Sequence, residues 1–306
     1  MNVASTPRRD LEESAPPLAI QHLASGAVTN VLSIDVEEWF QAEVYARAIQ
    51  RERWPTIPSR VAASTERLLE TLDHARVRAT FFVLGIVAER LPNLVREIAA
   101  AGHEIGSHGW GHRPIWSLNR DAFFEDVSRA RRILQELSGQ PVLGYRAPTF
   151  SITSRTLWAT NELRRAGYAY DSSIFPTLHD RYGIPDAPKA IHQLEGGLWE
   201  IPPSVLQLGP LHVPVAGGGY FRLYPLLLTR AAIRFLNQRL ARPAVVYVHP
   251  WEFDEDQPRP RISRLSQLRH TVGIGVNEHK LQQLLMEFRF ASCEEALTYA
   301  GAALSA

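Results

Sequence analysis

The stretch VLSIDVEEWF at residues 31–40 decides the fold class of this chain. Residues 31–34 form a short, mainly apolar run typical of a buried strand, and Asp35 and Glu37 follow where that strand should end. Downstream, short β-rich runs alternate with longer segments of helical periodicity. Because parallel strands joined by crossover helices produce this alternation, the sequence predicts an α/β barrel or a doubly wound sheet.

The periodicity places eight strands and six helices along the chain. The expected strands are Val31–Ile34, Ala79–Leu84, Glu104–Ser107, Val142–Tyr145, Tyr168–Tyr170, Leu198–Ile201, Val245–Val248 and Phe288–Phe290. The expected helices are Val61–His74, Asn93–Ala101, Asp121–Leu137, Ser154–Ala166, Leu226–Leu240 and Glu278–Met286. Residues 1–27 lack sustained periodicity and are expected to form a flexible tail. Residues 28–306 are expected to form one catalytic domain.

The composition argues against several classes of protein. Lys and Arg number 33 against 32 Asp and Glu, so no electrostatic feature favours a nucleic-acid partner. The single cysteine, Cys293, can form neither an internal disulfide nor a cysteine zinc site and is expected to be a packed thiol. No run approaches the ~20 consecutive apolar residues of a membrane-spanning helix, and no secretory signal is evident. The protein is therefore expected to be soluble and cytoplasmic.

The segment His108-Gly-Trp-Gly-His112 is a candidate metal-binding motif. One helical turn would aim its two imidazoles in the same direction, and a carboxylate from another strand would complete a site with open positions for water and substrate. Asp35 and Glu37 are the available carboxylates, and a neighbouring acid could then deprotonate the bound water. Alternatively, the histidines bond to the backbone and the acids form a solvated strand end; the coincidence of both groups favours the metal site.

Further reactive side chains also follow predicted strands, namely Arg146, Asp171 and His249. In a parallel barrel such positions converge on one face, where active sites are built. His249 ends an apolar strand and suits a general acid, while Arg146 suits a clamp for a carboxylate. Taken singly, both residues could be structural.

In this order, the residues resemble the polysaccharide deacetylases of carbohydrate esterase family four, also called NodB-homology deacetylases. The resemblance covers roughly residues 31–290 and implies a distorted (β/α) barrel of about seven parallel strands. It implies that the metal ligands are Glu37, His108 and His112, and that the catalytic residues are Asp35 as base, His249 as acid, Arg146 orienting Asp35, and Asp171 as a loosely matched further acid. Most members carry adjacent aspartates in the first motif, whereas here Asp35 and Glu37 are separated by one residue, so these two roles could be exchanged or Glu38 could participate.

The resemblance also implies a substrate class and a cofactor. It implies a hydrolase that removes N-acetyl groups from a glycan, with a divalent cation, zinc first and nickel, cobalt, iron or manganese also suitable. The Asp-x-Glu motif, the segment GGGYFR at 217–222 and HPWE at 249–252 are similar to a subgroup found in bacterial exopolysaccharide loci with exosortase systems.

Three alternatives stay open at this stage. An allantoinase-like amidohydrolase would act on a small amide, and a non-catalytic protein would only bind glycans. The basic, amphipathic segment Leu226–Leu240 could contact the inner face of a membrane carrying a lipid-linked substrate, although a solvated barrel helix explains it more simply.

Residues 217–219 lack the Lys-Ser/Thr of a phosphate loop and indicate a tight turn on the substrate side. The oligomeric state is left undetermined.

Overall fold

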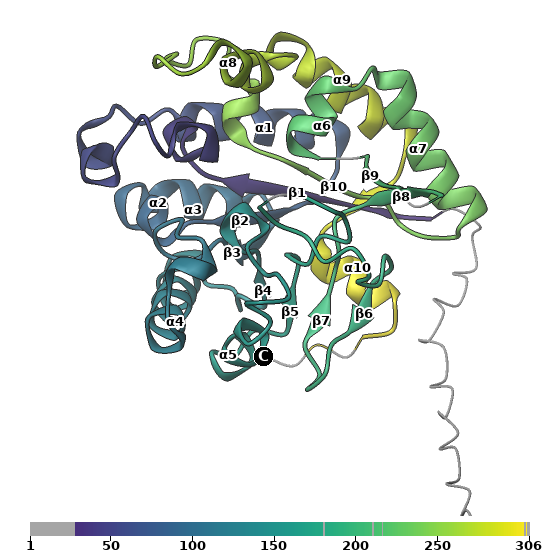
Figure 1. Ribbon diagram of the computed structural model, residues 1–306, viewed down its shortest axis with the longest axis horizontal. Coiled ribbons are helices and arrows are strands. Elements are labelled where there is room, and N and C mark those ends of the chain that lie inside the picture. The colour runs from purple at the N-terminus through teal and green to yellow at the C-terminus, as the bar shows by residue number, and fades with distance from the viewer. Residues whose placement is uncertain (1–27, 180, 210, 216, 303, 305–306) are drawn as a thin grey trace, which may run out of the picture.

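The computed structural model describes residues 28–179, 181–209, 211–215, 217–302 and 304. Within them, nine strands form a curled sheet in the order β10-β1-β2-β3-β4-β5-β7-β6, with β11 paired to the start of β1. Neighbouring strands are parallel except β6 and β7. Figure 1 shows the helices arranged around this sheet. The structure confirms the predicted α/β fold, a curled parallel sheet of the distorted-barrel kind.

The strands of the sheet are short apart from the first. Their bounds are β1 Asn30–Val36, β2 Thr80–Val83, β3 Glu104–Ser107, β4 Gly144–Tyr145, β5 Tyr170–Asp171, β6 His192–Gln193, β7 Trp199–Glu200, β10 Val245–Val248 and β11 Phe290–Ala291. A separate antiparallel hairpin consists of β8 Val205–Leu208 and β9 Leu211–Pro214. All eight predicted strands are present in the sheet. The sequence did not predict β6, β8 and β9, which lie largely at the surface and have no continuous apolar run.

The helices form the outer layer. Their bounds are α1 Val61–Ala75, α2 Gly85–Arg90, α3 Pro92–Ala100, α4 Arg120–Ser138, α5 Ala159–Arg165, α6 Gly218–Leu223, α7 Leu226–Arg239, α8 Arg264–Thr271, α9 Ile274–Glu287 and α10 Cys293–Tyr299. The six predicted helices are all present, while α2, α6, α8 and α10, each eight residues or shorter, were missed. The predicted turn at Gly217–Gly219 is the start of α6. No described helix combines the length and apolar character needed to cross a bilayer.

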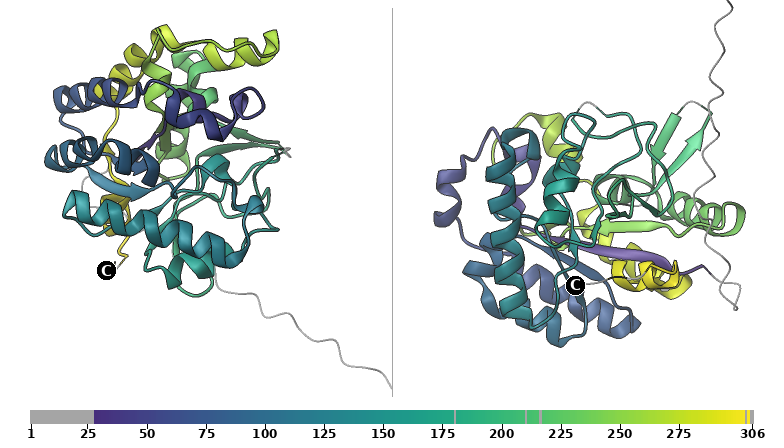
Figure 2. Two further views of the ribbon diagram at one scale, coloured as in Figure 1. Left: turned by 90° about the vertical axis from the view of Figure 1, so that its left-hand side faces the viewer. Right: turned by 90° about the horizontal axis from the view of Figure 1, so that it is seen from below.

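Strand β1 lies at the centre of the fold. All seven of its residues are buried, and its ladder partners are β10 on one side and β2 on the other. Both views in Figure 2 show strands passing through the middle of the molecule with helices packed around them. A strand covered on both faces needs a nearly continuous apolar run, which explains the signal at residues 31–34. Because the sheet is parallel, the carboxyl ends of β1, β3, β4 and β10 lie at one edge and deliver their following residues to one place.

Strand β11 and the start of α10 pack against β1. Cys293 is fully buried there, and its backbone amide donates to Thr80 Oγ1 at 2.7 Å. Burial is the main reason that the pKa of its thiol rises to about 12. The expectation of a packed thiol is confirmed. The tail expected over residues 1–27 lies outside the described residues, and the single domain expected over 28–306 stays a prediction.

Gly144 gives a test of the packing at the short strand β4. A Cβ atom built there would lie 2.0 Å from Tyr170 Cζ, inside the fully buried core. We expect Gly144→Ala to lower the free energy of unfolding by about 1–3 kcal/mol, because an overpacked core must shift its neighbours. Urea unfolding followed by circular dichroism measures it. Gly111→Ala is the matched control, since no atom lies within 4 Å of a Cβ there; equal stabilities of the two variants would contradict the packing described.

Candidate metal centre and active site

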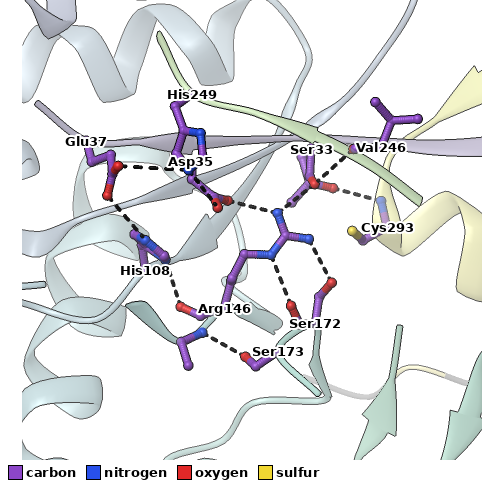
Figure 3. Close-up of polar contacts among 12 residues, drawn as sticks. Ser33, Asp35, Glu37, His108, Arg146, Ser172, Ser173, Val246, His249 and Cys293 are labelled. Carbon is purple, nitrogen blue, oxygen red and sulfur yellow. Dashed lines mark hydrogen bonds and ion pairs between the residues drawn. The ribbon is translucent and has the colours of Figure 1, made fainter. Parts of the chain in front are cut away.

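Asp35, at the carboxyl end of β1, is held by a buried arginine. Arg146 follows β4 and is fully buried, and its Nη1 donates to Asp35 Oδ1 at 2.8 Å and to Ser33 Oγ at 2.7 Å. Its other donors bind the carbonyl and hydroxyl oxygens of Ser172 at 3.0 and 2.7 Å (Figure 3). Burial alone would lower the pKa of Arg146, but the charge and hydrogen bond of Asp35, together with the electrostatic effects of Cys293 and Tyr247, raise that pKa. The guanidinium is therefore a permanent cation that fixes the orientation of Asp35.

Glu37, His108 and His112 form a cluster with the geometry of a metal site. All three are buried, and one ligand atom from each lies within 4.8 Å of the others. Glu37 Oε2 lies 2.6 Å from His112 Nε2 and 3.8 Å from His108 Nε2. Burial tends to raise the pKa of Glu37, but the adjacent imidazoles of His112, His249 and His108 dominate and lower it. Glu37 is thus an anion directed at two imidazole nitrogens.

The two histidines of the motif reach the same point from a loop. The helical turn expected at residues 108–112 is absent, because the chain leaves β3 without helical hydrogen bonds and the next helical turn begins at Ile115. Gly109 and His112 instead adopt positive φ angles of 76° and 53°, which fold the segment back on itself. Asp126 accepts from the Trp110 amide at 2.7 Å, and Arg51 donates to the carbonyls of Gly111 and His112. These contacts stabilise a backbone conformation that is costly for a non-glycine residue.

His108 is prepared as a neutral ligand. Its Nδ1 lies 2.8 Å from the carbonyl oxygen of Arg146, to which a protonated Nδ1 donates, leaving the lone pair of Nε2 facing Glu37. Burial lowers the pKa of His108 to about 4, so the imidazole is neutral at physiological pH. A neutral imidazole fixed by a hydrogen bond on its second nitrogen is the usual form of a metal-binding histidine.

His249, after β10, lies on the other side of the acids and is charged. Its Nε2 is 3.8 Å from Asp35 Oδ2 and 3.9 Å from Glu37 Oε1 (Figure 3). Its Nδ1 is 3.4 Å from Glu252 Oε2, and Glu252 Oε1 accepts from Arg222 Nε at 2.8 Å. Burial would lower the pKa of His249, but the charge and hydrogen bond of Glu252, with Glu37 and Asp35, raise it to about 9. His249 therefore carries a proton at neutral pH.

These groups surround one cavity of about 280 Å³. Asp35, Glu37, His108, His112 and His249 all line it. Phe150, Tyr182, Arg222, Tyr247 and Trp251 contribute further walls. The structure thus brings together side chains from β1, β3 and β10, as the strand-end positions predicted.

Asp171 lies apart from this cavity. It ends β5, is fully buried and accepts from Ser173 Oγ at 2.5 Å, and Ser173 in turn accepts from the Ala147 amide. Burial raises the pKa of Asp171 to about 6. Its buried neighbour Glu200 has a pKa raised well above its usual value by burial and by the charge of Asp171. The two coupled carboxyls therefore share a proton. Asp171 also interacts electrostatically with Arg146, through which it can act on the site.

Sequence reasoning missed the supporting roles of four residues. Ser33 and Ser172 bind Arg146, Trp251 Nε1 donates to Glu37 Oε1 at 3.0 Å, and Glu252 pairs with His249. Trp251 and Glu252 had a sequence signal, because they follow the strand-end histidine within one turn. Ser33 and Ser172 had none, since their role depends on strand neighbours distant in sequence.

Comparison with protein families identifies part of the chain. Residues 55–170 match the family model described as polysaccharide deacetylase. This segment belongs to the polysaccharide deacetylase family. Residues 172–298 match a second model, described as a domain of unknown function (DUF3473). The polysaccharide deacetylase segment carries both motif histidines and Arg146, while the second segment carries His249 and Glu252.

Curated deacetylases resemble the chain over limited stretches. The peptidoglycan-N-acetylglucosamine deacetylase of Bacillus cereus is 36% identical over 99 residues, which are 32% of this chain and 36% of the relative. The peptidoglycan deacetylase of Helicobacter pylori is 28% identical over 109 residues, 35% of this chain and 36% of the relative. Each match therefore spans about a third of the relative. The resemblance to NodB-homology deacetylases is confirmed, and the exosortase-locus subgroup stays a prediction.

Solved structures support the fold of the chain. A candidate polysaccharide deacetylase from Mycobacterium smegmatis superposes with a TM-score of 0.61 at 21% identity, covering 96% of this chain and 99% of the other. The allantoinase Puue superposes with the same TM-score of 0.61 at 16% identity, covering 94% of each chain. Because one fold serves both proteins, these likenesses show architecture and leave function to the site.

The shared proton of Asp171 and Glu200 predicts a pH dependence of stability. Both folded-state pKa values lie above those of the unfolded chain, so the folded protein holds more protons and loses stability as pH rises above about 4. Glu200→Gln removes one of the two acids while keeping an acceptor for the Ile174 amide. The variant therefore loses less stability than the parent as pH rises. We expect the unfolding free energy of the variant minus that of the parent to rise by on the order of 1 kcal/mol per pH unit across the titration. Urea unfolding between pH 5 and pH 8 measures it; a pH-independent difference would contradict the shared proton.

Proposed function

We propose that this chain is a metal-dependent hydrolase that removes N-acetyl groups from a polysaccharide or oligosaccharide. The observation that carries the proposal is one cavity holding a carboxylate and two imidazoles of metal-site geometry, an arginine-bound second carboxylate, and a protonated histidine. Family membership supports the deacetylase reaction. The peptidoglycan deacetylases that match the chain support an N-acetylated glycan as substrate.

The donor set fits a divalent cation held by Glu37, His108 and His112. One anionic oxygen and two imidazole nitrogens suit zinc, which we propose as the metal, with nickel, cobalt, iron and manganese as the other candidates. Three protein ligands leave positions open for water and substrate, as catalytic sites require. A cation bound there would supply Lewis acidity and lower the pKa of a coordinated water toward ~7.

Asp35 and His249 divide the proton transfers between them. Asp35 Oδ1 is occupied by Arg146, so Oδ2 is the oxygen that can accept a proton from the attacking water. Water adds to the acetamide carbonyl, and the resulting tetrahedral intermediate collapses to acetate and an amine. His249 gives its proton to the departing nitrogen, because an unprotonated nitrogen anion would be a poor leaving group. The reverse division, with Glu37 as base and Asp35 as ligand, is disfavoured because Arg146 occupies Asp35 and both histidines face Glu37.

We further propose a role in bacterial exopolysaccharide biosynthesis, at the cytoplasmic side of the membrane. Its support is the Asp-x-Glu arrangement of the first motif together with the Glu252 that follows His249, features of the sequence subgroup named above. Acetate release from chitin oligomers, without hydrolysis of allantoin, would separate this function from a small-amide hydrolase. A protein that only binds glycans would bind the oligomers and release no acetate.

The base assignment is tested by Asp35→Asn. The amide cannot accept the proton, so we expect turnover to fall by about 10²–10⁴-fold. Metal content, measured by plasma mass spectrometry, should stay near one ion per chain, since Asp35 is outside the ligand set. Glu37→Gln is the contrast and should lose both metal and turnover. Undiminished turnover in Asp35→Asn would overturn its role as base, and a parent protein that keeps full turnover after chelator treatment would overturn the metal dependence.

The acid assignment is tested by Glu252→Gln. The amide keeps the shape of the side chain but removes the charge that stabilises the imidazolium, so the pKa of His249 should fall from about 9. A general acid must be protonated, hence the alkaline limb of kcat/KM should move to lower pH by about one unit or more. The pH profile of acetate release measures it. Glu255→Gln, which changes an exposed acid on the same segment, is the control and should leave the alkaline limb in place. If the alkaline limb also stays in place in Glu252→Gln, His249 is not the general acid.

A further inference from the structure

A second hollow lies beside the metal centre, on the other side of the motif loop. This outer groove has a volume of about 730 Å³ and is formed by the segment after β1, helices α2 and α4, and the loop after β3. Gly111 lines the outer groove, whereas the adjacent His112 lines the catalytic cavity. Arg51 lines the groove and donates to the carbonyls of both residues. One short backbone segment therefore separates the two hollows.

The walls of the outer groove combine aromatic rings with balanced charge. Four arginines and four acidic side chains line it: Arg51, Arg90, Arg113, Arg129, Glu38, Glu89, Glu125 and Asp126. Such a balance gives no net attraction for a phosphate or a polyanion. It does supply many donors and acceptors on a partly apolar surface, which is the composition that neutral, hydroxyl-rich ligands require.

The aromatic residues of the groove are fixed in place. Trp110 is held between the backbone of Gly85 and the guanidinium of Arg129, which lies 3.4 Å from its ring centroid. Trp54 packs against Phe40 and Arg51. The indole nitrogen of Trp54 has no hydrogen-bond acceptor among the described residues, although it is shielded from solvent. A buried N–H without an acceptor is unusual and marks a place where a ligand hydroxyl would be stabilised.

The catalytic cavity is too small to hold more than part of a glycan. Its volume of about 280 Å³ lies below the ~300–1,000 Å³ typical of small-molecule sites, whereas the groove lies within that range. Sugar units next to the one being deacetylated must therefore lie outside the cavity. The outer groove is a hollow of suitable size, and it shares the motif loop with the metal centre.

We propose that the outer groove binds neighbouring sugar units of the same glycan chain, so that the enzyme selects polymers over short oligomers. This inference rests on the proposed deacetylase function. On binding, the Trp54 ring turns so that its N–H, which is shielded from solvent in this structure, donates a hydrogen bond to the chain. Arg113, exposed and without an ion pair among the described residues, contacts sugar hydroxyls at the rim of the groove.

The test compares a dimer and a hexamer of β-1,4-linked N-acetylglucosamine as substrates. The variants are Trp54→Phe, which keeps an aromatic ring but removes the N–H, and Arg113→Ala; the matched controls are Trp116→Phe and Arg155→Ala, both exposed and outside the two hollows. We expect the parent to prefer the hexamer, and each groove variant to lose about tenfold in kcat/KM on the hexamer with a smaller loss on the dimer. The controls should match the parent on both substrates.

A second measurement does not depend on turnover. Titration calorimetry measures the binding of the same oligomers to Asp35→Asn protein, with and without each groove substitution. Hexamer affinity that falls in the groove variants supports the groove, even if no acetate is released and the deacetylase proposal fails. Acetate release with an unchanged hexamer-to-dimer ratio in both groove variants overturns the groove and leaves the deacetylase proposal standing. Equal affinities for dimer and hexamer in the parent also overturn it.

Discussion

The buried ion pair between Arg146 and Asp35 is the constraint on which the site depends. A fully buried guanidinium costs several kcal/mol unless its donors are paired, and here the partners come from two strands: Ser33 and Asp35 from β1, and Ser172 from the end of β5. The carbonyl of the same arginine orients His108. One residue thus links the carboxylate, a proposed metal ligand and three strands. The guanidinium of Arg146 can make all these hydrogen bonds only when the strands of the sheet are assembled in the correct register.

Two histidines of the cavity show how neighbours decide chemistry. His108 is buried and His249 is largely buried, yet the pKa of His108 falls to about 4 and that of His249 rises to about 9. The difference is the partner of the second ring nitrogen, which is a neutral carbonyl for His108 and the carboxylate of Glu252 for His249. Neutral imidazoles bind metals and charged ones donate protons, so identical side chains are suited to different tasks.

Much of this arrangement could be predicted from the sequence, and the failures have physical causes. The eight core strands were found because burial on both faces demands short apolar runs, and parallel order then placed Asp35, Glu37 and His249 at one edge. The surface strands β6, β8 and β9 carry no such pattern. The predicted conformation of the His108–His112 loop was wrong, because its positive φ angles depend on Asp126 and Arg51, which are remote in sequence. The shared proton of Asp171 and Glu200 likewise depends on pairing between β5 and β7.

The burial of Cys293 has a consequence for handling and for measurement. The sequence contains a single cysteine, and a thiol with a pKa of about 12 beneath the sheet is almost entirely protonated and shielded from reagents. Oxidants and alkylating agents can modify it only after the C-terminal segment detaches from β1 and β2. Its rate of labelling would therefore report local opening where β11 and α10 pack against β1, with no engineered probe and no background from other sulfhydryls.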